Sequence, residues 1–321
     1  MDTTFALAHA PEGAGNATRM LAVAEALTAR GATVELAGGG PGAGFIEMNG
    51  FEEFEPTDLD FIDRREGEEG SVLAGLTHAA PRVLARLRDF ANWIDRTDPD
   101  VLLTDDPFAA IPALVTGVPF FRIDHSSVAC YDEPFERLAY RVFNRLSLEA
   151  GEGFFFTSVH QNPYPTRENL IPVGPIAHQP DDPADVDPFD ALVIPGTYSS
   201  GFEDIAERLA EEGRDVTLVG GDDWEVVPSM TPYNAAADVV VCTGFSSIAE
   251  AVVSGTPAVV YPFIDCQRGI ADAIEAADVP GIEVVHSVDE AVAAARDPPD
   301  PPTFENGAEA VADRLVAFAT E

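Results

Sequence analysis

The chain has 321 residues and a formal net charge of −38, from 56 acidic and 18 basic residues, and every basic residue is an arginine. Its 46% content of hydrophobic residues is enough to bury domain cores and excludes a disordered chain, and its length predicts two domains or one large one. The negative charge excludes binding to duplex nucleic acid through a basic face.

The absence of lysine beside so many acids predicts adaptation to high salt, with an ordinary acidic protein as the alternative. Molar salt shortens the Debye length to about 3 Å and screens the self-repulsion of such a chain. The cysteines, Cys130, Cys242 and Cys266, are too widely spaced to indicate a disulfide framework or a zinc site. The first residues resemble a strand rather than a signal peptide, and no apolar run has the length of a membrane span, so we expect a halophilic, cytoplasmic protein.

Short apolar runs bounded by Gly, Pro and Asp alternate with longer amphipathic segments, which predicts βαβ units around mostly parallel sheets. In the first half we expect strands at Phe5–Ala8, Thr33–Ala37, Val101–Thr104, Phe120–Ile123 and Phe154–Thr157. Helical periodicity predicts a helix through Met20 and Leu27 and another from Val72 to Ile94. Residues 1–160 therefore form a Rossmann-like domain in this interpretation.

Residues 161–189 contain seven prolines and little periodicity, which is typical of an interdomain linker. The alternation then restarts in a second Rossmann-like domain, 190–321, whose last helix is free to pack back on the first domain. Its expected strands are Ala191–Ile194, Val216–Val219, Val239–Cys242 and Ala258–Tyr261, and its expected helices are Phe202–Glu212, Ser247–Ser254, Gly269–Ala277 and Gly307–Ala319. Two such domains place a ligand cleft between the carboxyl ends of their strands.

The first predicted strand-to-helix turn contains Gly13 and Gly15, whose backbone amides could approach an anion at the positive end of the helix. A purely structural tight turn is the alternative. A dinucleotide site would need a third glycine at position 18 and an acid near position 37. Thr18 and the run Gly38–Gly40 stand there instead, which argues against a nicotinamide dehydrogenase.

The second half carries a denser constellation of small, hydroxyl and charged residues after three predicted strands. They are Gly196, Thr197 and Ser199; Gly244, Ser246 and Ser247; and Asp265, Gln267 and Arg268. Glu250 lies one turn into the helix that opens after Gly244, where its carboxylate suits a pair of ribose hydroxyls. Two structural alternatives remain, namely a solvated Glu250 and an Asp265 that caps the next helix.

From Ala237 to Gln267 the chain resembles the GT-B glycosyltransferases of the family 28 type. This group includes the N-acetylglucosaminyltransferase of peptidoglycan assembly and proteins described as predicted teichoic-acid-type glycosyltransferases. The shared pattern is an Ala-Asp strand, a Gly-hydroxyl turn, Ala-Glu, Gly-x-Pro and Asp-x-Gln. The first turn with Ala17, Thr18 and Arg19 also fits, so the resemblance covers nearly the whole chain. It implies two Rossmann-like α/β domains that face each other across a cleft.

The resemblance also implies roles for individual residues. Glu250 would hold the ribose, and the segment Val227–Met230 would meet the base. Gly196, Thr197, Ser199, Gly244, Ser246 and Ser247 would surround the diphosphate. Asp265 and Gln267 would bind the transferred sugar, with Arg268 as the nearby cation. The acceptor would meet Gly13, Gly15, Asn16 and Arg19, although a surface salt bridge is the alternative for Arg19.

One position departs from the family pattern, because Asn16 stands where the family usually has histidine. Asparagine can orient a hydroxyl but cannot accept its proton. The candidate replacement bases at strand ends are Asp105, Asp106, Asp124 and His125, with His9 as a weaker one. We favour His125, whose ordinary pKa of about 6.5 suits proton transfer, and a loop histidine without a role is the alternative.

These features predict a metal-independent, inverting glycosyltransferase without a cofactor, which uses a UDP-sugar or another nucleotide-sugar and a glycan or lipid-linked acceptor. The alternatives are an inactive nucleotide-sugar-binding subunit and a nucleotide-sugar epimerase or hydrolase. Arginines at helical spacings could touch lipid phosphates in a weak peripheral contact, or form a solvated helix face. These arginines are Arg82, Arg86, Arg88, Arg137, Arg141 and Arg145.

Overall fold

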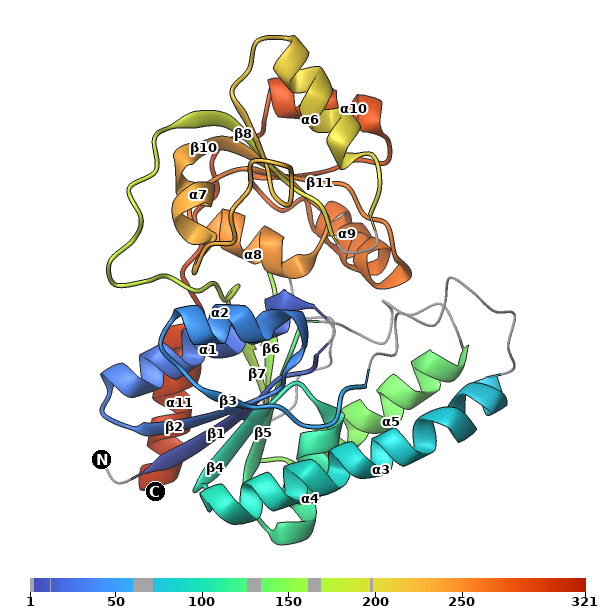
Figure 1. Ribbon diagram of the computed structural model, residues 1–321, viewed down its shortest axis with the longest axis vertical. Helices are drawn as coiled ribbons and strands as arrows, with labels where there is room; N and C mark the ends of the chain where they lie inside the picture. The colour runs from blue at the N-terminus through green and yellow to red at the C-terminus, as the bar shows by residue number, and fades with distance from the viewer. Residues whose placement is uncertain (1–2, 12, 60–71, 126–133, 161–168, 197–198) are drawn as a thin grey trace.

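The computed structural model describes residues 3–11, 13–59, 72–125, 134–160, 169–196 and 199–321. Within them the chain forms two α/β lobes, each built on one sheet (Figure 1). The N-lobe sheet has the strand order β3-β2-β1-β4-β5-β6-β7, and the C-lobe sheet has the order β12-β11-β10-β8-β9. All strand pairs in both sheets are parallel, as the sequence predicts.

The N-lobe contains the first seven strands and the helices that connect them. Its strands are β1 (Thr4–Ala8), β2 (Thr33–Ala37), β3 (Glu53–Phe54), β4 (Val101–Thr104), β5 (Phe120–Asp124), β6 (Gly153–Thr157) and β7 (Leu170–Val173). Its helices are α1 (Ala14–Ala29), the short 3₁₀ helix η1 (Gly40–Gly42), α2 (Ala43–Met48), α3 (Val72–Thr97), α4 (Pro107–Thr116) and α5 (Pro134–Ala150). The strand order reverses between β1 and β4, which is where ligands bind in such sheets.

The C-lobe repeats the pattern with shorter strands. Its strands are β8 (Phe189–Ile194), β9 (Val216–Leu218), β10 (Ala237–Cys242), β11 (Ala258–Val260) and β12 (Ile282–Val284). Its helices are α6 (Phe202–Glu211), α7 (Thr231–Ala236), α8 (Phe245–Val253), α9 (Asp265–Ala277) and α10 (Val288–Arg296). The order reverses between β8 and β10, so the loops after these two strands meet at one point of the sheet.

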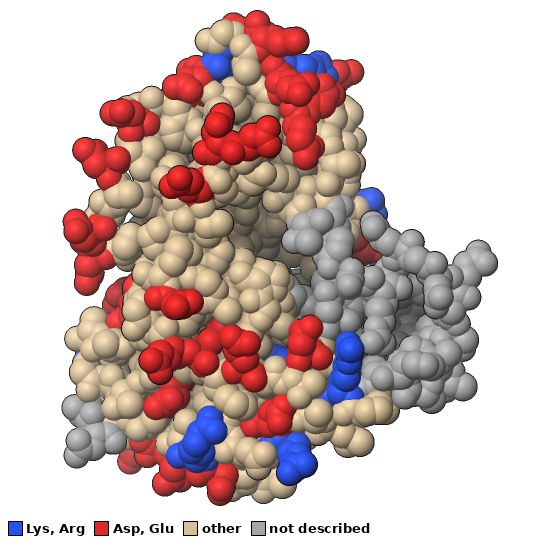
Figure 2. Space-filling model, in the orientation of Figure 1, with Lys and Arg blue, Asp and Glu red and all other residues tan. Residues whose placement is uncertain are grey.

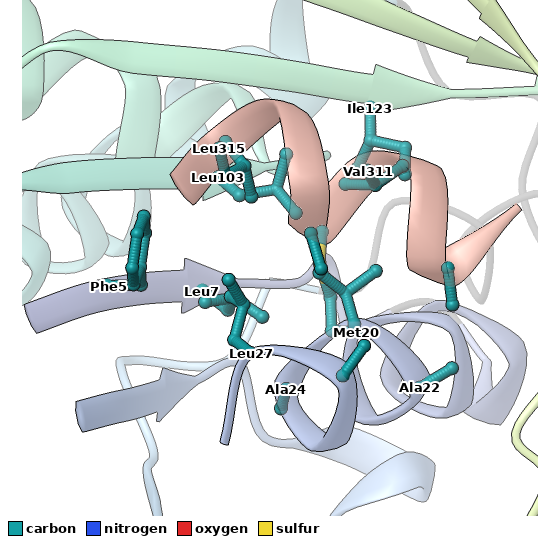
Figure 3. Close-up of a cluster of buried hydrophobic side chains, with 14 of the residues drawn as sticks. Phe5, Leu7, Met20, Ala22, Ala24, Leu27, Leu103, Ile123, Val311 and Leu315 are labelled. Atoms are coloured by element: carbon teal, nitrogen blue, oxygen red, sulfur yellow. The ribbon is translucent and has the colours of Figure 1, made fainter. Parts of the chain in front are cut away.

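The last helix, α11 (Ala308–Thr320), returns to the N-lobe and packs beside α1 (Figure 1). Its buried Val311 and Leu315 join Leu7 of β1 and Met20 and Leu27 of α1 in one hydrophobic cluster (Figure 3). Removing this apolar surface from water is the main stabilising contribution to the lobe. The chain therefore crosses between the lobes twice.

Asn306 joins the two crossings. Its side-chain amide accepts from the backbone N–H of Ala177 at 3.3 Å and donates to the carbonyl of Ala177 at 2.7 Å. Gly307 lies so close to Gly174 that a Cβ on residue 307 would be 2.5 Å from the carbonyl oxygen of Gly174. The two connections thus form one joint between the lobes.

The sequence missed several short elements. The prediction of a linker over 161–189 is wrong for β7, which pairs with β6 as the outer strand of the N-lobe sheet. Pro172 obscures this strand in the sequence, but an edge strand tolerates proline because one side of it needs no backbone hydrogen bond. The sequence prediction also omits the two-residue β3, β12 and the helices α4, α5, α7 and α10, although α5 and α10 are amphipathic.

Acidic side chains are spread over both lobes on the face in Figure 2, where arginines are few and a hollow lies between the lobes. None of the described helices combines the length and the apolar character that a membrane span requires.

Candidate active site

The N-terminal ends of α1 and α8 meet between the lobes. A Cβ on Gly15 would lie 2.0 Å from Ser246 Oγ, so only glycine permits this approach. Gly13 caps α1 with φ +98°, a conformation that favours glycine, and Gly244 caps α8. Neither helix has a side-chain cap. The sequence expected Gly13 and Gly15 to admit a ligand, whereas the space next to Gly15 is taken by the other lobe.

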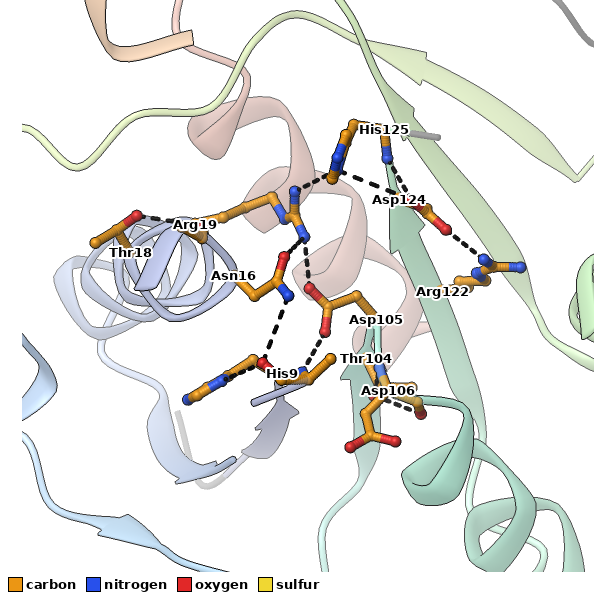
Figure 4. Close-up of polar contacts among 12 residues, drawn as sticks. His9, Asn16, Thr18, Arg19, Thr104, Asp105, Asp106, Arg122, Asp124 and His125 are labelled. Atoms are coloured by element: carbon orange, nitrogen blue, oxygen red, sulfur yellow. Dashed lines mark hydrogen bonds and ion pairs between the residues drawn. The ribbon is translucent and has the colours of Figure 1, made fainter. Parts of the chain in front are cut away.

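Arg19 organises the N-lobe side of this junction (Figure 4). Its NH2 group donates to Asp105 Oδ2 at 2.5 Å and to Asn16 Oδ1 at 2.9 Å, and NH1 donates to His125 Nδ1 at 3.0 Å. We call these four residues the Arg19 cluster. Arg19 is only 4% exposed, and its contacts are internal. Arg19 therefore holds the cluster together and does not present its charge to an acceptor phosphate as the sequence suggested.

Asp105 is also fully engaged. Besides Arg19, its carboxylate accepts from the backbone N–H of Ala10 at 2.7 Å. Burial raises the pKa of the Asp105 carboxyl, and the charges of Arg19 and His9 oppose this rise. Asn16 donates weakly to the carbonyl of Ala10 at 3.5 Å. Asp105 and Asn16 thus connect the end of β1 to the start of α1, and each oxygen of the Asp105 carboxylate already accepts one hydrogen bond.

His125, the base that the sequence favoured, follows β5 and faces both lobes. Its ring lies parallel to that of Phe245 of α8, with centroids 4.6 Å apart and an interplanar angle of 7°. Burial and the positive charge of Arg19 lower the pKa of His125 to about 4, and Asp124 opposes this only in part. His125 is therefore neutral near pH 7, but the nitrogen that faces Arg19 already accepts a hydrogen bond.

Asp124 holds His125, a member of the Arg19 cluster, in position. It accepts from the backbone N–H of His125 at 2.7 Å and from Tyr140 Oη at 2.5 Å, and it forms an ion pair with Arg122. The Arg122 guanidinium lies over the ring of Phe143, 4.1 Å from its centroid. A carboxylate with these partners fixes the end of β5.

His9 is completely buried at the end of β1. Nε2 lies 2.9 Å from Glu53 Oε2 and Nδ1 lies 3.1 Å from the carbonyl oxygen of Ala10. Burial alone lowers the pKa of His9, but the hydrogen bond and the charge of Glu53 outweigh it and raise the pKa. Both ring nitrogens of His9 thus face oxygen atoms inside the N-lobe, which gives this side chain a structural role at the end of β1. Sequence reasoning missed Glu53, since β3 is too short to show a period.

Two further sequence candidates have structural roles. Asp106 caps α4 by accepting from the backbone N–H of Phe108 at 2.7 Å, and it pairs with the buried Arg86 at 2.6 Å. Arg86 is therefore not part of a surface that touches lipid phosphates.

Gly38 leaves room for the His9 ring, because a Cβ on residue 38 would lie 2.3 Å from that ring.

On the C-lobe side, the loops after β8, β10 and β11 converge. A Cβ on Gly196 would lie 2.7 Å from Thr243 Cγ2, with Gln267 Nε2 and Ser199 Oγ next nearest. Gln267 Oε1 accepts from Thr243 Oγ1 at 2.8 Å and from the backbone N–H of Phe263 at 2.9 Å. Only the amide nitrogen of Gln267 is thus left for a sugar hydroxyl. Thr197 and Cys130 lie outside the described residues.

Glu250 follows Ser246 by one helical turn and therefore shares the face of α8 that meets Gly15. It is 8% exposed; no hydrogen bond or ion pair joins its carboxyl to another described residue, and its oxygens keep a small contact with solvent. Burial raises the pKa of Glu250 to about 7. Burial and the nearby Glu250 also raise the pKa of the Cys242 thiol at the end of β10. A buried carboxyl without a partner costs stability, which is unusual unless a ligand supplies the partner.

The remaining residues that the sequence predicts for nucleotide-sugar binding are more exposed or already form hydrogen bonds or ion pairs. Asp265 pairs with Arg268 at 2.9 Å at the start of α9. Ser229 is buried and donates to the carbonyl of His178 at 3.1 Å. Over the parts of the chain that the structure describes, no group of three or more His, Cys, Asp or Glu side chains is arranged to hold a metal ion.

No protein-family model matches this chain, and no curated protein matches it either. Solved structures do resemble it over its whole length. The SsfS6 glycosyltransferase of Streptomyces sp. SF2575, complexed with thymidine diphosphate, is 18% identical with a TM-score of 0.65, covering 99% of this chain and 96% of that one. The glycotransferase of kitacinnamycin is 18% identical with a TM-score of 0.63, covering 100% and 95%.

MurG of Acinetobacter baumannii is 15% identical with a TM-score of 0.57, covering 98% of this chain and 99% of that one. At such low identity these likenesses establish the fold and not the activity. The chain has the GT-B fold, as the sequence predicted.

Proposed function

We propose that this protein is a glycosyltransferase that moves a sugar from a nucleotide-sugar, a UDP-sugar or a related donor, to a glycan or lipid-linked acceptor. The observation that carries the proposal is the unpartnered, buried Glu250 one turn behind the uncapped end of α8. Its surroundings suit a nucleoside diphosphate, with amides at the helix end for the phosphates and a carboxylate for the ribose diol. Support for this use of the fold comes from SsfS6, whose structure contains thymidine diphosphate.

The α8 end would stabilise the leaving diphosphate. The first N–H groups of a helix lack intrahelical partners, and the helix dipole adds partial positive charge at the same place. Ser246 and Ser247 lie in this first turn. As the bond from the sugar to the diphosphate breaks, the negative charge on the diphosphate grows and these donors bind it more strongly, which lowers the barrier. We therefore propose a transfer that needs no divalent metal, and unchanged activity in EDTA is the expected result.

The acceptor would approach from the N-lobe, across the junction of the two helix ends. A direct displacement requires the acceptor on the opposite side of the sugar from the diphosphate, so the product would have the inverted anomeric configuration. Proton NMR of the first product formed distinguishes inversion from retention.

Two N-lobe helices suit a lipid-linked acceptor. Leu84 of α3 is 67% exposed, and Leu138 and Val142 of α5 are 55% and 59% exposed. Exposed arginines accompany them, among them Arg88 and Arg141. Exposed aliphatic side chains with arginines beside them suit contact with a lipid that carries a phosphate. This supports the lipid-linked alternative for the acceptor.

A thermal-shift screen of nucleotide sugars in molar salt tests the donor site, because a ligand that binds only the native state raises the unfolding temperature. We expect a UDP-sugar or a related compound to stabilise the wild type and to lose this effect in Glu250→Ala. Glu207→Ala, which changes an exposed glutamate of α6, is the matched control and should respond like the wild type. An equal shift in Glu250→Ala would remove Glu250 from the site.

A second function, a nucleotide-sugar-binding subunit without turnover, is favoured by one observation. Asn16 cannot take a proton, and Asp105 and Asp124 are held by other groups. Release of nucleoside diphosphate in the presence of acceptors separates the two functions. Sustained release indicates a transferase, and tight binding without release indicates a subunit.

A further inference from the structure

Among the described residues, His125 is the member of the Arg19 cluster whose ring stacks on a ring at the start of α8. Its side chain is 18% exposed and touches both lobes. Phe245, the ring that it stacks on, is the first residue of α8, and Ser246 follows directly. The imidazole edge is therefore positioned by groups from both sides of the junction.

The hydrogen bond from Arg19 fixes the protonation of this ring. A guanidinium can only donate, so Nδ1 of His125, 3.0 Å from Arg19 NH1, must accept and cannot carry a proton. A neutral imidazole with a bare Nδ1 carries its proton on Nε2. The flat stack on Phe245 fits a neutral ring, and burial beside Arg19 disfavours the imidazolium form.

The other nitrogen is a donor with no partner in the parts of the chain that the structure describes. Nε2 of His125 makes no hydrogen bond with any described residue, although Nδ1, the backbone N–H and the ring face are all engaged. A fixed N–H without a partner, next to a helix end that suits a phosphate, has the chemistry of a hydrogen-bond donor to an anion. It does not have the chemistry of a base, because the lone pair that would accept a proton is used by Arg19.

We propose that His125 acts as a neutral hydrogen-bond donor, whose Nε2–H binds a phosphate oxygen at the junction of α1 and α8. This inference rests on the proposed function and assigns His125 a role opposite to that of a general base. The donor's leaving diphosphate is one source of such an oxygen, and the phosphate of a lipid-linked acceptor is the other. Arg19 is then a positioning residue, because it sets the tautomer of His125 without touching the phosphate.

The tautomer is measurable in the wild-type protein. Nitrogen-15 NMR of histidine-labelled protein should show a His125 ring with Nε2 protonated and Nδ1 bare, unchanged between about pH 5 and 8, the range in which an ordinary histidine titrates. A proton on Nδ1, or titration near pH 6.5, would overturn the proposal. This experiment needs no variant and no knowledge of the substrate.

Two variants distinguish the roles of Nδ1 and Nε2 of His125. His125→Asn keeps an acceptor for Arg19 near the position of Nδ1 but has no donor at the position of Nε2. His125→Gln places an amide N–H near the position of Nε2. We expect His125→Asn to bind its phosphate ligand roughly 10- to 100-fold more weakly, the range for a hydrogen bond to a charged group, and His125→Gln to stay within a few-fold of the wild type.

Calorimetry with UDP, thymidine diphosphate and dodecyl phosphate identifies the source of the phosphate. Weaker nucleotide binding in His125→Asn assigns the contact to the donor, and weaker dodecyl phosphate binding assigns it to the acceptor. If both variants bind every probe as the wild type does, the His125 proposal fails while the donor site stands. If the wild type binds none of the probes, the proposed function fails with it.

Discussion

The two helix ends that meet between the lobes differ in how their polar groups are used. At α1, Arg19, Asp105 and Asn16 bind one another and the end of β1. At α8, the N-cap residue Gly244 has no side chain that could bond to the helix end, and Glu250 is buried without a partner among the described residues. In the first region the charged groups neutralise one another, although Arg19 Nε is buried without a hydrogen bond, whereas in the second the Glu250 carboxyl has no opposite charge beside it among the described residues. The difference fits a donor site that is centred on α8, with the Arg19 cluster holding His125 in place beside it.

The largest expected effect is on the stability of the N-lobe. Arg19→Ala leaves the Asp105 carboxylate buried with only the Ala10 amide as a partner, and breaking a buried ion pair in this way costs about 3–5 kcal/mol. Chemical denaturation in molar salt measures the loss. The double variant Arg19→Ala/Asp105→Asn should recover part of it. A loss below about 1 kcal/mol would show that the Arg19 cluster is not a stabilising unit.

A substitution of Glu250 on α8 is expected to stabilise the protein, whereas Arg19→Ala destabilises it. The pKa of Glu250 in the folded state, about 7, lies above its ordinary value of 4.5, so the folded state binds this proton more tightly than the unfolded state does. The destabilisation is absent below about pH 4.5 and complete above about pH 7. Glu250→Gln should thus stabilise the protein at pH 8, by at most about 3 kcal/mol at ~1.4 kcal/mol per pKa unit.

Thermal unfolding of Glu250→Gln at pH 5 and pH 8 provides the check, because the gain in stability should appear only at the higher pH. A variant that is less stable than the wild type at pH 8 would contradict the picture of an unpartnered carboxylate.

A single substitution can disrupt the close contact between the N-terminal ends of α1 and α8. Gly15→Ala places a methyl group where Ser246 lies, so the lobes must separate and the transfer rate should fall by about a hundredfold, as small misplacements of reacting groups do. Gly15→Ala/Ser246→Gly should restore most of the rate. Gly44→Ala is the control, because nothing lies within 4 Å of a Cβ there. Full activity in Gly15→Ala would show that the contact is incidental.

A smaller effect is expected on donor affinity. Ribose hydroxyls donate to an ionised carboxylate, so binding of UDP should strengthen as pH rises through about 7, by at most tenfold per pH unit. Calorimetry between pH 6 and 8 measures it. Glu250→Gln should show a flat profile, and a flat wild-type profile would dissociate Glu250 from the ribose.

The sequence predicted features that depend on position along a helix or strand. Gly244 and Glu250 lie on a helix end after a strand, and the alternation of strands and helices predicts that this end faces the cleft. The sequence could not predict which side chains from distant parts of the chain contact one another in the fold. Arg19 and Asp105 are 86 residues apart, and their contact depends on β1 and β4 being neighbours. The contact between His125 and Arg19, which are 106 residues apart, could not be predicted for the same reason.

The most direct test of the account is a crystal structure of the protein with a nucleoside diphosphate that it binds. We expect phosphate oxygens within hydrogen-bond distance of the Ser246 and Ser247 amides and both ribose hydroxyls on the Glu250 carboxylate. A nucleotide bound elsewhere, with Glu250 still buried and without a partner, would contradict the central claim that the α8 end is the donor site.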